Sequence, residues 1–110
     1  MVDKPGSPYS PPRRAPRVPA DGIQLSVEGA AARLIDLSEQ GLRFVGDQAF
    51  EEGHILHATM RAGAEEVSAE GTVKWCRPEG PGRYNIGISF RGSNDQALRK
   101  GIFALFMAAG

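Results

Sequence analysis

Hydrophobic and polar side chains alternate along most of the chain from residue 22 to residue 91. In the segment EVSAEGTVKWCR, residues 66–77, the apolar side chains Val67, Ala69, Val73 and Trp75 share one parity, and polar side chains fill most of the other. Shorter runs of the same kind occupy residues 23–28, 42–44, 56–60 and 84–90. A period of two is typical of half-buried β-strands. Glycines that mark turns separate the runs, so the pattern predicts about six strands at the spacing of a small barrel or sandwich.

The last segment, SNDQALRKGIFALFMAAG, changes to the spacing of a helix. Ser93 and Gln96 form a capping-box pattern at its start. One face of the predicted helix is apolar and carries Leu98, Ile102, Leu105 and Phe106. We therefore expect a helix over residues 93–108 that covers an open end or side of the barrel, with Gly101 permitting close approach.

The first twenty residues have a different composition from the rest. They contain six of the eight prolines and few hydrophobic side chains, which is typical of a segment without a packed core. We predict a flexible tail over residues 1–12, followed by an extended arginine loop over residues 13–21. In an extended chain Arg13 and Arg17 lie about 13 Å apart and point to the same side.

Charge and cysteine content limit the classes of function. The formal net charge is zero, which does not favour nonspecific binding to DNA, RNA or membranes. Positive charge is concentrated in residues 1–20, which contain Lys4 and three arginines but only one acidic residue, an aspartate. Cys76 is the single cysteine, and no apolar run near the start resembles a signal peptide or a membrane span. We expect a cytoplasmic protein without membrane insertion.

Residues suited to catalysis or metal binding are few. His54 and His57 lie three positions apart in a predicted strand, where odd spacing sends their side chains to opposite faces. Cys76 has no histidine near it in the sequence, and there is no glycine-rich phosphate loop or cysteine cluster. We therefore predict no enzymatic activity, no metal and no cofactor.

The segment IDLSEQGLRF is the second stretch that suggests a site. Asp36 and Ser38 are two positions apart, so in a strand they project from one face, opposite Ile35 and Leu37. An ionised Asp36 accepts hydrogen bonds from groups such as a guanine edge, Ser38 donates or accepts, and Gly41 allows a turn. A strand that ends in a polar turn explains this segment equally well when it is taken alone. In the same way, a solvated basic tail alone would explain the arginine segment RRAPR, residues 13–17.

Together the two stretches have the form R-x-x-x-R followed by D-x-S-x-x-G, which resembles the PilZ domain family. The resemblance extends over most of the chain, because GTVKWCR and YNIGISF are similar to the late strands of that family. It implies an all-β fold, a six-stranded antiparallel β-barrel with a C-terminal α-helix. The domain would cover residues 13–110, with the barrel at 22–91.

The resemblance also implies a ligand, the bacterial second messenger cyclic di-GMP. Its two phosphates and two guanines suit arginine, whose guanidinium binds phosphate oxygens or guanine O6 and N7 in a bidentate manner. Arg13 and Arg17 match the two arginines of the first motif, and Arg14 lies between them. Residues Asp36, Ser38 and Gly41 match the second motif.

Trp75 has two interpretations. At the barrel surface an indole would offer a stacking platform to a guanine, worth about 1–3 kcal/mol by analogy with nucleic-acid binders. Its parity with Val67 and Val73 favours packing in the core. We keep Trp75 as a candidate ligand contact and expect it to be buried.

The resemblance implies a small receptor and adaptor, in which cyclic di-GMP orders the arginine loop over the barrel and a downstream protein receives the signal. A first alternative is a degenerate PilZ-like module for protein interaction that does not bind nucleotide, although such members lose motif residues that this chain retains. A second is a small barrel that binds single-stranded nucleic acid. That class needs stacked aromatic side chains on an outer face, whereas the parity of Phe44, Tyr84 and Trp75 points mostly inward.

Overall fold

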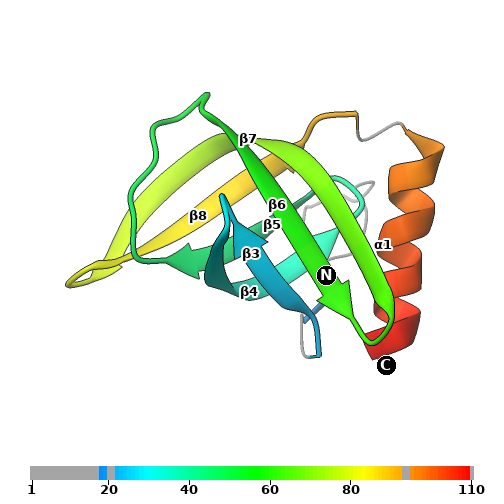
Figure 1. Cartoon of the computed structure of the whole chain (residues 1–110). Helices are drawn as coiled ribbons and strands as arrows, with labels where there is room; N and C mark the ends of the chain where they lie inside the picture. Colours follow the sequence, from blue (N-terminus) through cyan, green and yellow to red (C-terminus); the bar gives the residue numbers. More distant parts are fainter. Residues whose placement is uncertain (1–17, 20–21, 93–94, 110) are drawn as a thin grey trace, which may run out of the picture.

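The computed structural model describes residues 18–19, 22–92 and 95–109 of the 110-residue chain. These residues form strands and one helix, with a long hairpin projecting from the barrel at the end far from the helix (Figure 1). The elements are β2 (Val18–Pro19), β3 (Gln24–Val27), β4 (Ala30–Ser38), β5 (Gly41–Gly46), β6 (Ile55–Ala62), β7 (Glu65–Gly80), β8 (Arg83–Phe90) and α1 (Gln96–Ala109).

The six strands from β3 to β8 close into an antiparallel barrel. Around the barrel the order is β3, β6, β7, β8, β5 and β4, and β4 pairs back to β3. β4 closes the ring because its first residues pair with β3 and its later residues pair with β5. The predicted six-stranded barrel with a C-terminal helix is therefore confirmed.

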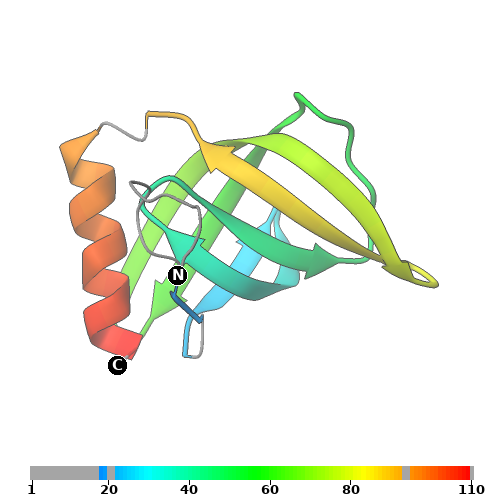
Figure 2. The ribbon, with the colours of Figure 1, turned by 180° about the vertical axis from the view of Figure 1, so that it is seen from behind.

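The short strand β2 continues the sheet beside the second half of β4. Val18 pairs with Leu37 and Pro19 pairs with Asp36, on the same edge of β4 as β3 but beyond the residues that β3 reaches. Figure 2 shows this side of the barrel, with β2 lying beside β4. The backbone that follows Arg17 thus enters the fold next to Asp36.

The core lies inside the barrel and continues under the helix. One layer of it crosses four strands in register, because Leu37 pairs with Leu42, Leu42 with Ile88, and Ile88 with Val73. Each of these side chains is at most 3% exposed. The alternation read from the sequence therefore predicts the inward direction of these four side chains correctly.

Helix α1 starts later than the sequence pattern predicts. Asp95 is the N-cap, since its Oδ1 accepts a hydrogen bond from the Ala97 N–H at 2.8 Å and its carbonyl accepts the Arg99 N–H at 3.2 Å. The predicted start at Ser93 is wrong for this reason, and Ser93 itself lies outside the described residues. The described helix runs from Gln96 to Ala109.

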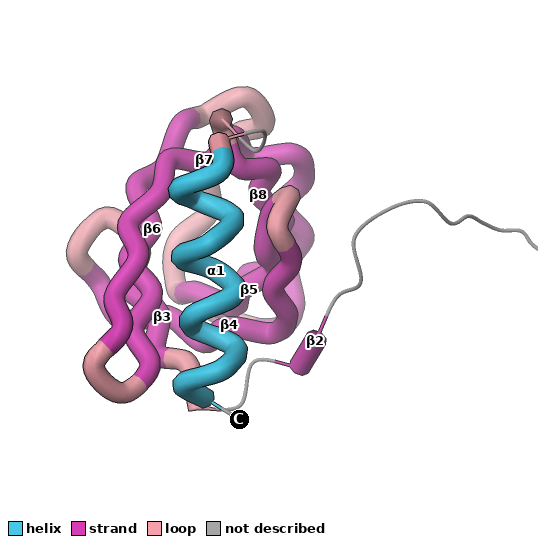
Figure 3. The backbone as a smooth tube through the Cα atoms, turned by 90° about the vertical axis from the view of Figure 1, so that its right-hand side faces the viewer, coloured by secondary structure: helices cyan, strands magenta, loops and turns pink. Residues whose placement is uncertain are grey.

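The helix covers one end of the barrel and packs on β6 and β7 (Figures 1 and 3). Ile102 and Leu105 are completely buried against the core, and Leu98 and Phe106 are partly buried beside them. A Cβ on Gly101 would lie 2.8 Å from Val67 Cγ2, so this position requires glycine for close packing. In the described ranges, no helix has the length and apolar content needed to cross a membrane.

Candidate functional site

Asp36 and Arg43 form a cross-strand ion pair on the outer surface of β4 and β5. The two residues are direct partners in the strand register. Arg43 Nε donates to Asp36 Oδ2 at 2.7 Å, and Arg43 Nη2 contacts the same oxygen. The Asp36 side chain is only 11% exposed, whereas the Arg43 side chain is 41% exposed. Arg43 therefore presents positive charge to solvent while it holds a nearly buried carboxylate in place.

Ser38 and Gly41 shape the turn that links these two strands. Ser38 Oγ accepts a hydrogen bond from the Gln40 N–H at 3.2 Å and donates to the Gly41 carbonyl at 3.4 Å. A Cβ on Gly41 would overlap the Ile88 carbonyl oxygen, so only glycine fits against β8 here. Ser38 is 2% exposed. In this structure both residues define the shape of the turn beside Asp36.

The strand register places four residues side by side across four strands. Asp36 on β4 pairs with Arg43 on β5, Arg43 pairs with Gly87 on β8, and Gly87 pairs with Trp75 on β7. We call these four positions the outward row. Neighbouring strands lie about 4.8 Å apart, so the row extends about 14 Å along the curved surface. On β4, β5 and β8, the residues of the row are sequence neighbours of the buried layer that contains Leu37 and Ile88, and they lie on the opposite face of the same strands.

Trp75 lies on this outer surface, and the expectation that it is buried in the core is wrong. A β-bulge interrupts the register between Val73 and Trp75, which reverses the parity of the strand. Val73 is buried and Cys76 packs against the core, whereas Trp75 does not belong to the core and lines a surface pocket. The bulge thus moves the indole from the inside to the outside of the barrel.

Gly87 provides the floor on which the Trp75 indole rests. A Cβ at Gly87 would lie 2.5 Å from Trp75 Nε1, so any other side chain would displace the ring. On the following outward position of β7, Arg77 places its guanidinium carbon 4.9 Å from the centroid of the indole. This is a cation–π distance, and it fixes the indole from a second direction.

A shallow open pocket of about 500 Å³ lies over the outward row. Arg43 and Trp75 line two of its sides, and Gly87 lies between them. The remaining lining residues are Gln40, Lys74, Ile88 and Ser89. With Arg43 and Lys74 at the pocket, the described surface favours an anionic ligand that also has a flat aromatic group.

Three predicted site residues, Arg13, Arg14 and Arg17, lie outside the described residues. Of the remaining predicted residues, Asp36, Ser38 and Gly41 lie together at the β4–β5 turn. Trp75 comes to the same surface from β7.

Sequence reasoning missed several residues of the pocket, and Arg43 is the most important of them. Its parity opposite Leu42 and Phe44 predicts an outward side chain two residues after Gly41, so a signal was available. Lys74 reaches the pocket through the bulge, for which the sequence gives no clear signal. Gly87 interrupts an otherwise bulky strand, which is typical of close approach by another group.

The two histidines lie away from the pocket. β6 begins at Ile55, so the prediction that both histidines belong to this strand is wrong for His54, which precedes it and packs edge-on against Phe50 at a centroid distance of 5.9 Å. His57 Nδ1 lies 3.3 Å from Glu28 Oε2. Its Nε2 lies 3.0 Å from Glu70 Oε2. No group of metal-binding side chains occurs in the described part of the chain.

Glu28 has a lowered pKa in this arrangement. The main cause is the hydrogen bond that the His57 backbone N–H donates to Glu28 Oε2 at 2.6 Å, and the His57 ring adds to it. Glu28 holds a positive φ of 51° at the β3–β4 turn. This contact links the turn to β6 on the surface of the barrel.

Comparison with known proteins gives one family and a shared fold. The family model described as PilZ domain matches residues 11–107. An uncharacterized Legionella protein has a TM-score of 0.57 at 15% sequence identity, covering 83% of this chain and 89% of that chain. The Bacillus subtilis inhibitor of motility (MotI/DgrA) has a TM-score of 0.60 at 18% identity, covering 88% of this chain and 53% of that chain. This chain therefore spans about half of the Bacillus protein. No curated protein matches the sequence.

Proposed function

Because this chain belongs to the PilZ domain family, a family of cyclic di-GMP receptors, we propose that it binds cyclic di-GMP and signals to a partner protein. The observation that carries the proposal is the outward row, in which Arg43, Gly87 and Trp75 line one pocket and Asp36 is paired with Arg43 beside it. The row joins a carboxylate, a guanidinium and an indole ring. Those are the groups needed for a ligand with two guanines and two phosphates.

The arginine segment supplies the remaining charge. The backbone of Val18 pairs with Leu37, so Arg17 is attached directly to a strand that borders the site. An extended segment from Arg13 to Arg17 covers about 13 Å, which is similar to the length of the outward row. Arg13, Arg14 and Arg17 can therefore reach phosphates bound near Arg43.

Each residue of the turn has a separate role in this proposal. The Asp36 carboxylate accepts hydrogen bonds from the N–H groups of a guanine edge, and Arg43 holds it in position. Ser38 and Gly41 hold the turn in the shape that places Asp36 opposite Arg43.

Trp75 stacks on a guanine of the ligand. Its indole lies on Gly87 and beneath Arg77, so the ring is already oriented before a ligand arrives. Pre-organisation of this kind lowers the entropy that is lost on binding. Lys74, which lies on the same pocket, adds a cation for a phosphate.

Binding changes the surface of the domain through the arginine segment. A ligand with two negative phosphates offsets the entropy of ordering residues 13–17 over the barrel. The new surface is then presented to a downstream protein, and the chain acts as an adaptor in the cytoplasm without chemistry of its own. The Bacillus neighbour is named an inhibitor of motility, which agrees with an action on another protein.

The test is isothermal titration calorimetry with cyclic di-GMP, with GTP and cyclic di-AMP as controls. Saturable binding that is selective for cyclic di-GMP at micromolar or better affinity supports the receptor. The variants Arg13→Ala and Arg17→Ala should lose this binding while circular dichroism shows a folded barrel. Absence of heat at two temperatures would instead favour the degenerate interaction module.

A further inference from the structure

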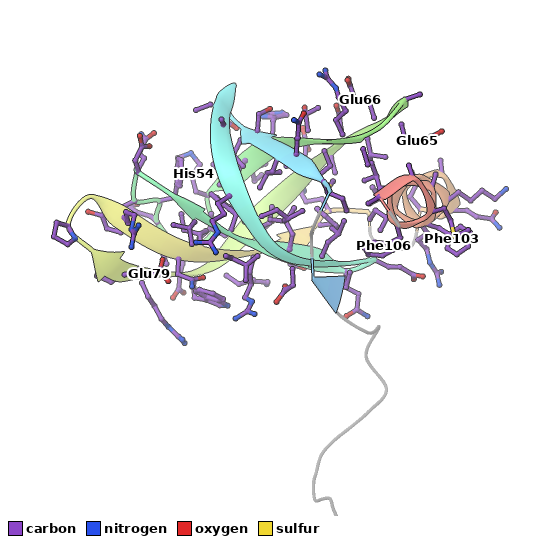
Figure 4. All side chains as sticks on the ribbon, turned by 90° about the horizontal axis from the view of Figure 1, so that it is seen from below. His54, Glu65, Glu66, Glu79, Phe103 and Phe106 are labelled. Atoms are coloured by element: carbon purple, nitrogen blue, oxygen red, sulfur yellow. The ribbon has the colours of Figure 1, made fainter. Side chains whose placement is uncertain are left out.

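The outer surface of α1 carries two large hydrophobic side chains that contact little of the domain. Phe103 is 64% exposed and Met107 is 67% exposed, and they lie one turn apart on α1. Figure 4 shows Phe103 on the side of the helix that faces away from the barrel. In the described residues, the other large hydrophobic side chain with high exposure is Ile55, at 40% on β6. Phe103 and Met107 thus form an apolar surface apart from the pocket.

Charges of opposite sign flank the two ends of this surface. Lys100 lies one turn before Phe103 on the same side of α1, and the helix contains no acidic residue. Near the other end, Gly63 of the β6–β7 hairpin lies beside Ala108, and Glu65 follows it on β7 (Figure 4). Neither Lys100 nor Glu65 forms an ion pair with another residue in the described part of the chain.

We propose that the outer α1 surface, formed by Lys100, Phe103 and Met107, binds the same surface of a second copy of this chain. A two-fold axis between Phe103 and Met107 makes the two helices antiparallel. The apolar side chains then pack on their counterparts at the centre. Lys100 of each copy faces the end of the other helix, where Glu65 lies, so the two flanking charges are complementary.

The charged side chains around this surface argue against a membrane as its binding partner. A helix that lies on an anionic bilayer normally has several basic residues along its polar side. Here Arg99 is paired with Glu39, and Glu65 lies just after the hairpin glycine that contacts Ala108 near the C-terminal end of the helix. In the dimer, Lys100 of one copy lies opposite Glu65 of the other, whereas an anionic lipid surface would repel Glu65.

The area available predicts a weak dimer. A helix of 14 residues is about 21 Å long, and one face of it is smaller than the roughly 800 Å² per partner of a standard interface. Association should therefore depend on concentration and appear in the micromolar to millimolar range. It does not require cyclic di-GMP, so its outcome is independent of the proposed receptor function.

Sedimentation velocity of the full chain over a range of concentrations tests the proposal. We expect the weight-average sedimentation coefficient to rise toward that of a dimer. Phe103→Glu should raise the dissociation constant by about tenfold or more, as for a residue at the centre of an interface. Ile55→Glu is the matched control, because it changes an exposed hydrophobic side chain that lies away from α1 and should leave association unchanged.

A charge exchange tests the two-fold arrangement. Lys100→Glu and Glu65→Lys should each weaken the dimer, and the double variant should restore it, because the pair forms again with reversed signs. A monomer at every concentration would overturn the proposal, as would a dimer that Phe103→Glu leaves unchanged. Phe103-dependent binding of a monomer to vesicles of phosphatidylcholine and phosphatidylglycerol would assign the surface to a membrane and also overturn it.

Discussion

Glu39 and Arg99 connect the turn beside Asp36 to the C-terminal helix. Arg99 Nε donates to Glu39 Oε1 at 2.9 Å, across sixty positions of sequence. Glu39 lies between Ser38 and Gly41, and Arg99 lies in the first turns of α1. Both side chains are about half exposed, so the contribution of the pair to stability is about 0–1 kcal/mol. Its position matters more, because the pair joins the turn directly to the helix.

The variant Glu39→Gln should separate the helix from the turn. We expect cyclic di-GMP to slow amide hydrogen exchange in residues 96–109 of the wild-type protein, and Glu39→Gln to remove most of this effect with little loss of affinity. Hydrogen exchange with mass spectrometry measures it. Glu66→Gln is the control, since it breaks the similarly exposed Arg61–Glu66 pair away from the turn. An unchanged ligand effect in Glu39→Gln would show that another contact carries the coupling.

The Asp36–Arg43 pair should be more costly to break than an exposed ion pair. Arg43→Met leaves the nearly buried Asp36 carboxylate without one of its partners, and we expect it to lower the free energy of unfolding by about 1–3 kcal/mol. Urea denaturation monitored by circular dichroism measures the change. Adding Asp36→Asn should recover part of the loss, with a coupling energy of about 0.5–3 kcal/mol. Additive losses in the double variant would contradict the pairing.

Strand parity and the two motifs allowed much of the fold and part of the site to be predicted. The alternation at Leu42, Ile86 and Ile88 identified buried positions, because each strand has one face in the core. The helix was also visible, since Ile102 and Leu105 follow helical spacing. These features depend on local sequence, which is why they were predictable.

The features that were not predictable depend on contacts between distant residues. Trp75 was expected in the core because a bulge leaves no clear mark in the alternation of its strand. The pairing of Arg43 with Asp36 and Gly87 follows from the strand register, which the sequence of any single strand does not determine. For the same reason the sequence did not indicate the contact of Glu39 with Arg99.

Acid should weaken the contact between the β3–β4 turn and β6. The pKa of Glu28 is lowered from its ordinary value of 4.5, first by the His57 backbone N–H and then by the His57 ring. A carboxylate with a lowered pKa contributes stability above its unfolded pKa and loses it as the pH falls through the folded pKa. As the pH is lowered below 4.5, the urea concentration at the unfolding midpoint should therefore decrease more steeply for the wild-type protein than for Glu28→Gln. Parallel profiles would show that Glu28 does not contribute.

Replacing Gly87 tests how Trp75 is oriented. In Gly87→Ala the added Cβ occupies the space of the indole, whose Nε1 lies 2.5 Å from that position, so the ring must leave its place beneath Arg77. We expect the emission spectrum of Trp75, the single tryptophan, to shift. If the indole stacks on a guanine, affinity for cyclic di-GMP should fall by about 1–3 kcal/mol, the usual contribution of one stacked base.

Gly80→Ala is the control for this substitution, because a Cβ at Gly80 meets no atom within 4 Å. Both glycines lie on the same hairpin of β7 and β8, so any general loss of helix or strand content would affect the two variants alike. A spectral shift in Gly87→Ala without a loss of affinity would show that Trp75 rests on the barrel without contacting the ligand. A loss of affinity that Trp75→Ala reproduces, and that is not additive in the double variant, would place the indole in the binding site, since both changes would then remove the same contact.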